Sequence, residues 1–204
     1  MTSDALQLSD IRIRGRRVEL NPHDCFACGE LNVHGLQLIL HVTEELCWTE
    51  LTLPRRFQGW EGIAHGGIVC TILDELMAWS IVAGDSWAFA ARMSVDFRRP
   101  IQIGQRIRAE GRLVRTRRRL FDTAARIIAV DGGEVLATAA ATYVAAREDQ
   151  QRALKERYGF RLVQETSDAP ERVDASERGD ARLRSIRNAA HHDDLPARIR
   201  GERT

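Results

Sequence analysis

The stretch IAHGG at residues 63–67, followed by the apolar run IVCTILDELMAWSIVA at residues 68–83, is the most informative part of the sequence. The run is apolar on almost every side, so a helix formed by it would be surrounded by other structure. Asp74 and Glu75 lie near its middle, and a carboxylate in such a helix must find a partner or change its pKa. We therefore expect a buried helix over residues 68–83 that carries a functional carboxylate.

Segments rich in strand-forming residues flank this helix. Residues 36–42 and 46–53 are separated by a short polar turn, which predicts a hairpin. Four further strand candidates follow the helix, at residues 87–97, 106–116, 120–130 and 135–144, with turn signals at 100–104 and 131–133. This order predicts an α+β fold in which an antiparallel β-sheet wraps around a long central helix.

The composition divides the chain into an N-terminal extension (1–20), one folded domain (21–146) and a charged C-terminal tail (147–204). The tail has few large apolar side chains, so it cannot bury enough apolar area to offset its ordering entropy. We expect it to be largely disordered apart from short helices over 148–158 and 183–187. We also expect residues 159–204 to be dispensable for stability.

The overall charge and the cysteines limit the classes of function. A net charge of +1 indicates neither a nucleic-acid-binding nor a membrane-attracted surface. The N-terminus has no secretory signal pattern and no apolar run reaches spanning length, so we expect a cytoplasmic protein with no membrane partner. Four cysteines in such a chain are better interpreted as thiols than as disulfides.

Four short motifs in this order resemble one protein family: CFACGELNVHGL (25–36), HGG (65–67), LDE (73–75) and DFRRP (96–100). Together they are similar to the hotdog-fold acyl-CoA thioesterases of the phenylacetate-pathway type, in a branch with a CFxCG segment. The resemblance covers roughly residues 21–146. It implies a homodimer or dimer of dimers whose sheets join, an acyl-CoA substrate, no cofactor apart from the coenzyme A of that substrate, and no nucleic acid partner.

The resemblance also assigns roles to residues of the site. It implies that the backbone N–H of Gly67 points at the thioester oxygen and that Asp74 is the general base or nucleophile. Gln58 stands where relatives have a residue that positions the base or the water. Gly66 lies in the substrate-binding turn.

Physical chemistry of a helix N-terminus agrees with these roles. Orphan N–H groups and the positive dipole end stabilise a developing negative charge, and two glycines allow a thioester to come close. The alternative is a static packing turn at the glycines and a structural role for Asp74, bonded to backbone or arginine. Asp74 lies seven residues beyond Gly67, roughly 10 Å along the helix axis, so both can act on one carbonyl only if a second chain supplies its own Asp74.

Four further residues near these motifs have two interpretations each. His65 can act as an acid or base, but we favour a structural hydrogen bond that orients the loop. Arg98 and Arg99 end a strand and either hold CoA phosphates or are simply solvated. Glu75 points away from Asp74 around the helix, and we expect it in solvent or in a salt bridge, as a reserve candidate.

The Cys25-x-x-Cys28 pair suggests a metal site or packing. Structural zinc normally has four ligands, and His23, His34 and Cys47 would have to be recruited at irregular spacing. A redox dithiol would lack its usual βαβ context. We favour packing and expect no metal.

Two departures from the family pattern leave an alternative function open. Ala90 stands where relatives often have Thr or Ser, a hydroxyl that can hold the water, and Val33 replaces the usual proline. The first alternative is a non-catalytic acyl-CoA or acyl-carrier binding protein on the same fold. A hotdog dehydratase is weaker, because it would use a differently placed histidine–carboxylate pair.

Overall fold

The computed structural model describes residues 9–14 and 16–163. In chain order the elements are β1 (Asp10–Ile13), β2 (Arg16–Glu19), β3 (His41–Val42), β4 (Cys47–Thr52), the 3-10 helix η1 (Arg55–Phe57), α1 (Gly66–Val82), β5 (Ala88–Phe97), β6 (Arg106–Arg117), β7 (Leu120–Ala129), β8 (Val135–Ala145), α2 (Glu148–Arg157) and β9 (Arg161–Val163).

The strands form one sheet in the order β5-β8-β7-β6-β4-β3-β1-β2-β9. Neighbouring strands are antiparallel except β1 and β3, which pair in parallel through Asp10 with His41 and Ile11 with Val42. The α+β class is confirmed, but the expected antiparallel sheet is in fact mixed. The parallel pair arises because the segment before residue 21, expected to lie outside the domain, joins the sheet.

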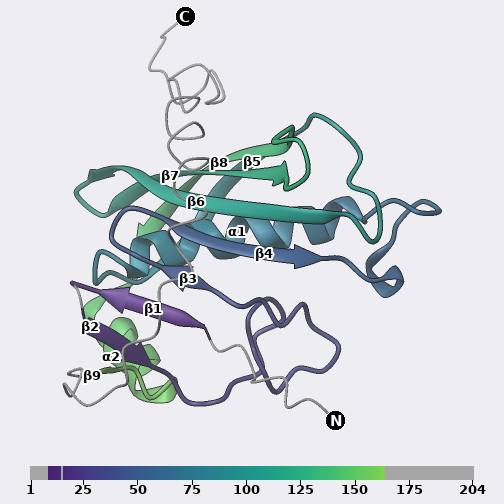
Figure 1. Cartoon of the computed structure of the whole chain (residues 1–204). Coiled ribbons are helices and arrows are strands. Elements are labelled where there is room, and N and C mark those ends of the chain that lie inside the picture. Colours follow the sequence, from purple (N-terminus) through teal and green to yellow (C-terminus); the bar gives the residue numbers. More distant parts are fainter. Residues whose placement is uncertain (1–8, 15, 164–204) are drawn as a thin grey trace, which may run out of the picture.

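Helix α1 packs against the sheet, where it contacts β4, β5, β6, β7 and β8; Figure 1 shows it running behind β6 and β4. Its side chains at Ile72, Leu73, Leu76 and Met77 are fully buried, as the apolar run predicts. Gly111 of β6 permits the close approach, since a Cβ there would lie 2.6 Å from the backbone carbonyl of Leu76. The sheet therefore fixes the position of α1 and of the carboxylates on it.

Most predicted elements match the structure to within one or two residues at each end, and one predicted strand is largely wrong. The predicted helix is α1, which begins two residues earlier, at Gly66. The strands predicted after it are β5 to β8. The predicted strand over residues 36–42 is wrong for residues 36–40, because Gln37 has a positive φ of 49° and breaks the extended chain. The N–H groups of Leu36 and Leu38 instead donate to the carbonyls of Phe26 and Ala27.

Both ends of the predicted domain extend further than the composition indicates. β2 pairs with β1 and with β9, so residues 10–19 and 161–163 are parts of the sheet, and Ile11, Ile13 and Val18 belong to the buried core. Helix α2 corresponds to the expected helix over 148–158 and lies beside β2 and β9 (Figure 1). Because β9 supplies backbone partners for β2, the predicted dispensable tail can begin only after residue 163.

Residues 1–8, 15 and 164–204, including the second expected tail helix, lie outside the described residues. Within the described part of the chain, no helix is long and apolar enough to cross a membrane.

Candidate active site

The N-terminus of α1 is built around His65, which is the N-cap residue. Its Nδ1 accepts a hydrogen bond of 2.9 Å from the N–H of Gly67, and its carbonyl oxygen accepts from Ile68 and Val69. The N–H of Gly66 has no acceptor among the described residues. His65 thus orients this turn, as the sequence predicts. The N–H of Gly67, which we expected to face a thioester oxygen, donates to His65 instead. The N–H of the adjacent Gly66 is available to a ligand.

A pocket of about 320 Å³ lies at this helix end. It brings together three residues predicted to bind substrate: Gly66, Arg98 and Arg99. The Arg99 guanidinium forms an ion pair with Glu134. Arg98 has no side-chain partner within the described ranges, so its charge is available to an anionic ligand.

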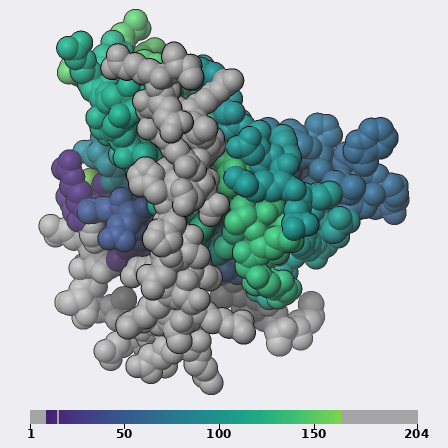
Figure 2. Space-filling model, turned by 90° about the horizontal axis from the view of Figure 1, so that it is seen from above, coloured from purple at the N-terminus to yellow at the C-terminus, as the bar shows by residue number. Residues whose placement is uncertain are grey.

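Aromatic side chains flank the same pocket. Phe97 and Trp60 line it, and they are 56% and 83% exposed. Trp60 belongs to the segment between β4 and α1, which projects from one side of the molecule in Figure 2. These exposed rings supply apolar surface for a ligand that enters beside the helix N-terminus.

Asp74 is held from the sheet by Tyr143 of β8. The Tyr143 hydroxyl donates to Asp74 Oδ1 at 2.6 Å and lies 3.1 Å from the Asp74 carbonyl oxygen. Burial and the adjacent Asp74 carboxylate raise the pKa of Tyr143 well above its usual range, so this hydroxyl remains a donor. Asp74 is half-buried, and its other oxygen has no hydrogen-bond partner among the described residues.

The glycine turn and Asp74 lie at opposite ends of β5. A Cβ on Gly66 would be 3.5 Å from Phe97, the last residue of β5. Tyr143, which holds Asp74, pairs in register with Ala90, close to the start of β5. Within one chain, the glycine turn and Asp74 are therefore too far apart to form one site.

Gln58 lies in the turn before α1. Its backbone bridges to Ala64, and its side-chain Oε1 accepts from the N–H of Gly62 at 3.4 Å. The structure thus places Gln58 beside the His65 turn and away from Asp74 of its own chain.

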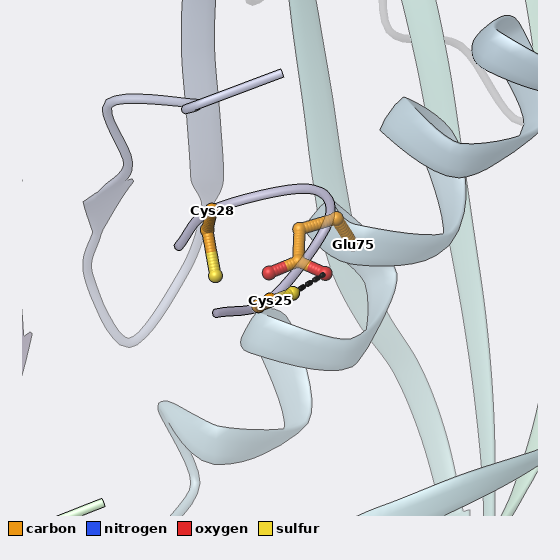
Figure 3. Close-up of side chains that lie close together, drawn as sticks. All are labelled: Cys25, Cys28 and Glu75. Atoms are coloured by element: carbon orange, nitrogen blue, oxygen red, sulfur yellow. Dashed lines mark hydrogen bonds between the residues drawn. The ribbon is translucent and has the colours of Figure 1, made fainter. Parts of the chain in front are cut away.

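The expectation for Glu75 is wrong. Its side chain faces the N-terminal segment, where Cys25 and Cys28 lie close to its carboxylate (Figure 3). Cys25 Sγ lies 4.0 Å from Glu75 Oε2, and Trp79 Nε1 donates to Oε1 at 2.9 Å. Helix spacing predicts that it points away from Asp74, but the segment that covers it precedes α1 by about forty residues and could not be inferred.

The electrostatics of this cluster are unusual. Burial raises the pKa of Glu75 to about 7, reinforced by the charge of Cys25. The hydrogen bond from Cys28 and the backbone N–H groups of Cys28 and Ala27 lower the pKa of Cys25 to about 5. The same thiol–thiol contact, together with burial, raises the pKa of Cys28. One thiolate is thus favoured beside a carboxyl group that resists ionisation.

Sequence reasoning missed Tyr143 as a member of the site. Its position in an alternating strand predicts which face of the sheet it occupies, and a buried tyrosine hydroxyl normally needs an acceptor. That signal could have identified Tyr143 as bonded, but not Asp74 as its partner.

Comparison with known proteins bears on the segment that carries this site. Residues 61–136 match the family model described as the thioesterase superfamily. This segment is thioesterase-like in sequence. It contains the glycine turn, Asp74, Arg98 and Arg99, while Gln58, Tyr143 and the Cys25 segment lie outside it. No curated protein matches the chain.

Solved structures share this fold, among them two thioesterase superfamily proteins. One such protein is 23% identical, with a TM-score of 0.56 over 59% of this chain and 60% of its own. Zebra fish thioesterase superfamily member 2 is 14% identical, with a TM-score of 0.54 over 58% and 90%. A protein from Streptococcus mutans UA159 bound to acetyl CoA is 17% identical, with a TM-score of 0.50 over 52% and 86%. The chain spans about three fifths of the first structure, and at these identities the likeness shows the fold alone.

Proposed function

We propose that this protein is an acyl-CoA thioesterase of the phenylacetate-pathway type, which hydrolyses its substrate to a free acid and coenzyme A. The observation that carries the proposal is the single helix that presents Gly66, next to Gly67, in a pocket and Asp74 beside Tyr143. In the hotdog arrangement α1 would be the long central helix. The thioesterase superfamily match supports the reaction class, and the acetyl CoA of the Streptococcus mutans structure supports the ligand class.

The reaction we propose uses the helix end as an oxyanion site. Asp74 takes a proton from water while the water oxygen attacks the thioester carbonyl carbon, or Asp74 attacks that carbon directly. In the second case the mixed anhydride left on Asp74 is then hydrolysed by water, which releases the acid and restores the carboxylate. The carbonyl oxygen becomes an oxyanion, which the N–H groups of Gly67 and Gly66 stabilise. The carbon–sulfur bond then breaks, and the coenzyme A thiolate leaves and is protonated. In the structure the Gly67 N–H donates to His65 Nδ1. The oxyanion would therefore share this N–H with His65 or take the place of His65 as its acceptor.

A dimer joined along β5 would bring the two parts of the site together. β5 pairs only with β8 among the described residues, so its outer edge is open to another strand. Two-fold pairing of β5 with a second copy would set the Phe97 end of one strand against the Ala90 end of the other. The Gly67 turn of one subunit would thereby approach Asp74 of its partner, with Gln58 beside that turn to position the water.

We expect the protein to be a dimer, or a dimer of dimers, at working concentrations. Light scattering coupled to size exclusion measures the mass directly. Matched runs at falling concentration, with turnover assayed in each fraction, show whether activity follows the dimer. A fully active monomer would contradict the shared site.

Coenzyme A recognition would fall to the strand end beside the pocket. Arg98 has an available guanidinium and can bind a phosphate, whereas Arg99 would first have to leave Glu134. We also propose a cytoplasmic location, since the free thiols of the described residues suit a reducing compartment.

Turnover of an acyl-CoA panel by the purified full chain tests the proposal. Short, long and aromatic acyl groups are compared by release of free thiol, with binding of the same compounds measured by calorimetry. Hydrolysis of at least one acyl-CoA well above the rate without protein supports the enzyme. Binding without turnover would support the acyl-CoA binding protein instead, a candidate favoured by Ala90, whose side chain carries no hydroxyl.

A further inference from the structure

The side chains of Cys25, Cys28 and Glu75 form a compact cluster on the side of α1 that faces the N-terminal segment. Their two sulfurs and one carboxylate oxygen all lie within 4.8 Å of one another. Figure 3 shows the three side chains converging from the turn at residues 25–28 and from α1. In a tetrahedral zinc site with Zn–S near 2.3 Å and Zn–O near 2.1 Å, ligand atoms are separated by roughly 3.5–3.8 Å. A small inward movement would therefore suffice for all three to bind one ion.

The turn that carries the two cysteines is shaped for a thiolate. The backbone of Ala27 and Cys28 helps to lower the pKa of the Cys25 thiol, and the N–H of Gly29 donates to the Cys25 carbonyl at 2.9 Å. Gly29 is required, because a Cβ there would overlap the backbone of Cys25 and His23. The backbone of the turn that carries Cys25 and Cys28 is therefore fixed by contacts of its own.

Glu75 lacks the partner that a buried carboxylate usually has. Its hydrogen bonds come from Trp79 Nε1 and from the cysteine side chains, and no arginine, lysine or histidine forms an ion pair with it among the described residues. Buried carboxylates are normally paired with a cation or coordinate a metal. Two thiols and a carboxylate without a counter-charge match a divalent cation.

We propose that Cys25, Cys28 and Glu75 bind one Zn²⁺ ion, with water as the fourth ligand. Two thiolates select a borderline-soft ion over Mg²⁺ or Ca²⁺, and the oxygen is also a normal zinc ligand. The ion would link the N-terminal segment to α1 at Glu75, one residue after Asp74. This replaces the packing role expected from the sequence, where the spacing of the cysteines could not show a third ligand on α1.

Zinc titration of the untagged full chain tests the site. The chain is stripped of metal and kept reduced and anaerobic, and Zn²⁺ is titrated in competition with a chromophoric chelator. We expect one ion per chain. Cys25→Ser or Cys28→Ser should weaken the affinity about a hundredfold or more, and Glu75→Gln about tenfold or more. Zn²⁺ should also raise the Tm of the wild type by roughly 3 °C or more, but not that of Cys25→Ser.

Matched variants on the same helix separate this site from the hydrolytic one. Cys70→Ser and Asp74→Asn make the same chemical changes outside the cluster and should retain wild-type zinc affinity. Cobalt binding to the wild type gives a readout that depends on no variant, because a thiolate–cobalt charge-transfer band appears only if sulfur is a ligand. The proposal is overturned if the reduced wild type binds no Zn²⁺, if cobalt shows no such band, or if Cys70→Ser weakens binding as much as Cys25→Ser.

Discussion

Asp74→Asn is expected to lower acyl-CoA turnover by about a hundredfold or more while acyl-CoA binding persists. The amide keeps the size of the side chain and can still accept from Tyr143, which donates to Oδ1 in the wild type. It removes the basic oxygen that would take the proton from water or attack the carbonyl. Steady-state turnover and calorimetric binding, measured on the same preparation, give both quantities.

Two variants serve as controls for Asp74→Asn. Asp131→Asn makes the same change in the exposed turn between β7 and β8 and should retain full turnover. Glu75→Gln changes the neighbouring carboxylate, which faces the cysteines, and should affect turnover far less than Asp74→Asn. A folded, dimeric Asp74→Asn protein with near-normal turnover would show that Asp74 is not the base or nucleophile.

Gly67→Pro should lower turnover by about a hundredfold to a thousandfold, the range for loss of one oxyanion donor. Proline removes the N–H at the second position of α1, and the first turn of a helix tolerates proline because its N–H groups have no intrahelical acceptor. The expected effect is on kcat, with the helix content unchanged by circular dichroism.

The controls distinguish loss of the donor from loss of the helix cap. His65→Ala removes the acceptor on Nδ1 but retains the Gly67 N–H, so its main cost should be about 1 kcal/mol of stability. Gly67→Ala keeps the N–H, although its Cβ would lie 3.0 Å from His65 Nδ1 and the imidazole must shift. If His65→Ala lost as much turnover as Gly67→Pro, the Gly67 N–H would have no catalytic role of its own.

The sequence was sufficient for the elements that have strong periodicity. α1 is apolar on nearly every side, and β5 to β8 are long β-forming runs separated by glycine and proline turns, so local preference and tertiary packing agree. These elements carry Gly66, Gly67 and Asp74, and β5 ends directly before Arg98 and Arg99. The spacing of Gly67 and Asp74 along one helix also indicated that a second chain is needed to complete the active site.

The rest depended on contacts between distant segments. Residues 10–19 are rich in arginine, yet Ile11 and Ile13 alternate with polar residues and are buried once β1 and β2 join the sheet. That alternation was a usable strand signal, obscured by the charged composition. The contact between Cys25 and Glu75 joins residues fifty positions apart, and no local pattern predicts such a contact.

The most direct test of the shared active site is the turnover of a mixed dimer. One subunit carries Asp74→Asn, the other carries Gly67→Pro, and two different affinity tags allow the mixed species to be isolated after co-expression. If each site combines Gly67 of one subunit with Asp74 of the other, the mixed dimer has one intact site and one doubly defective site. About half of wild-type turnover per dimer is then expected. Turnover as low as that of the two parent variants would place both groups in one chain and contradict the account.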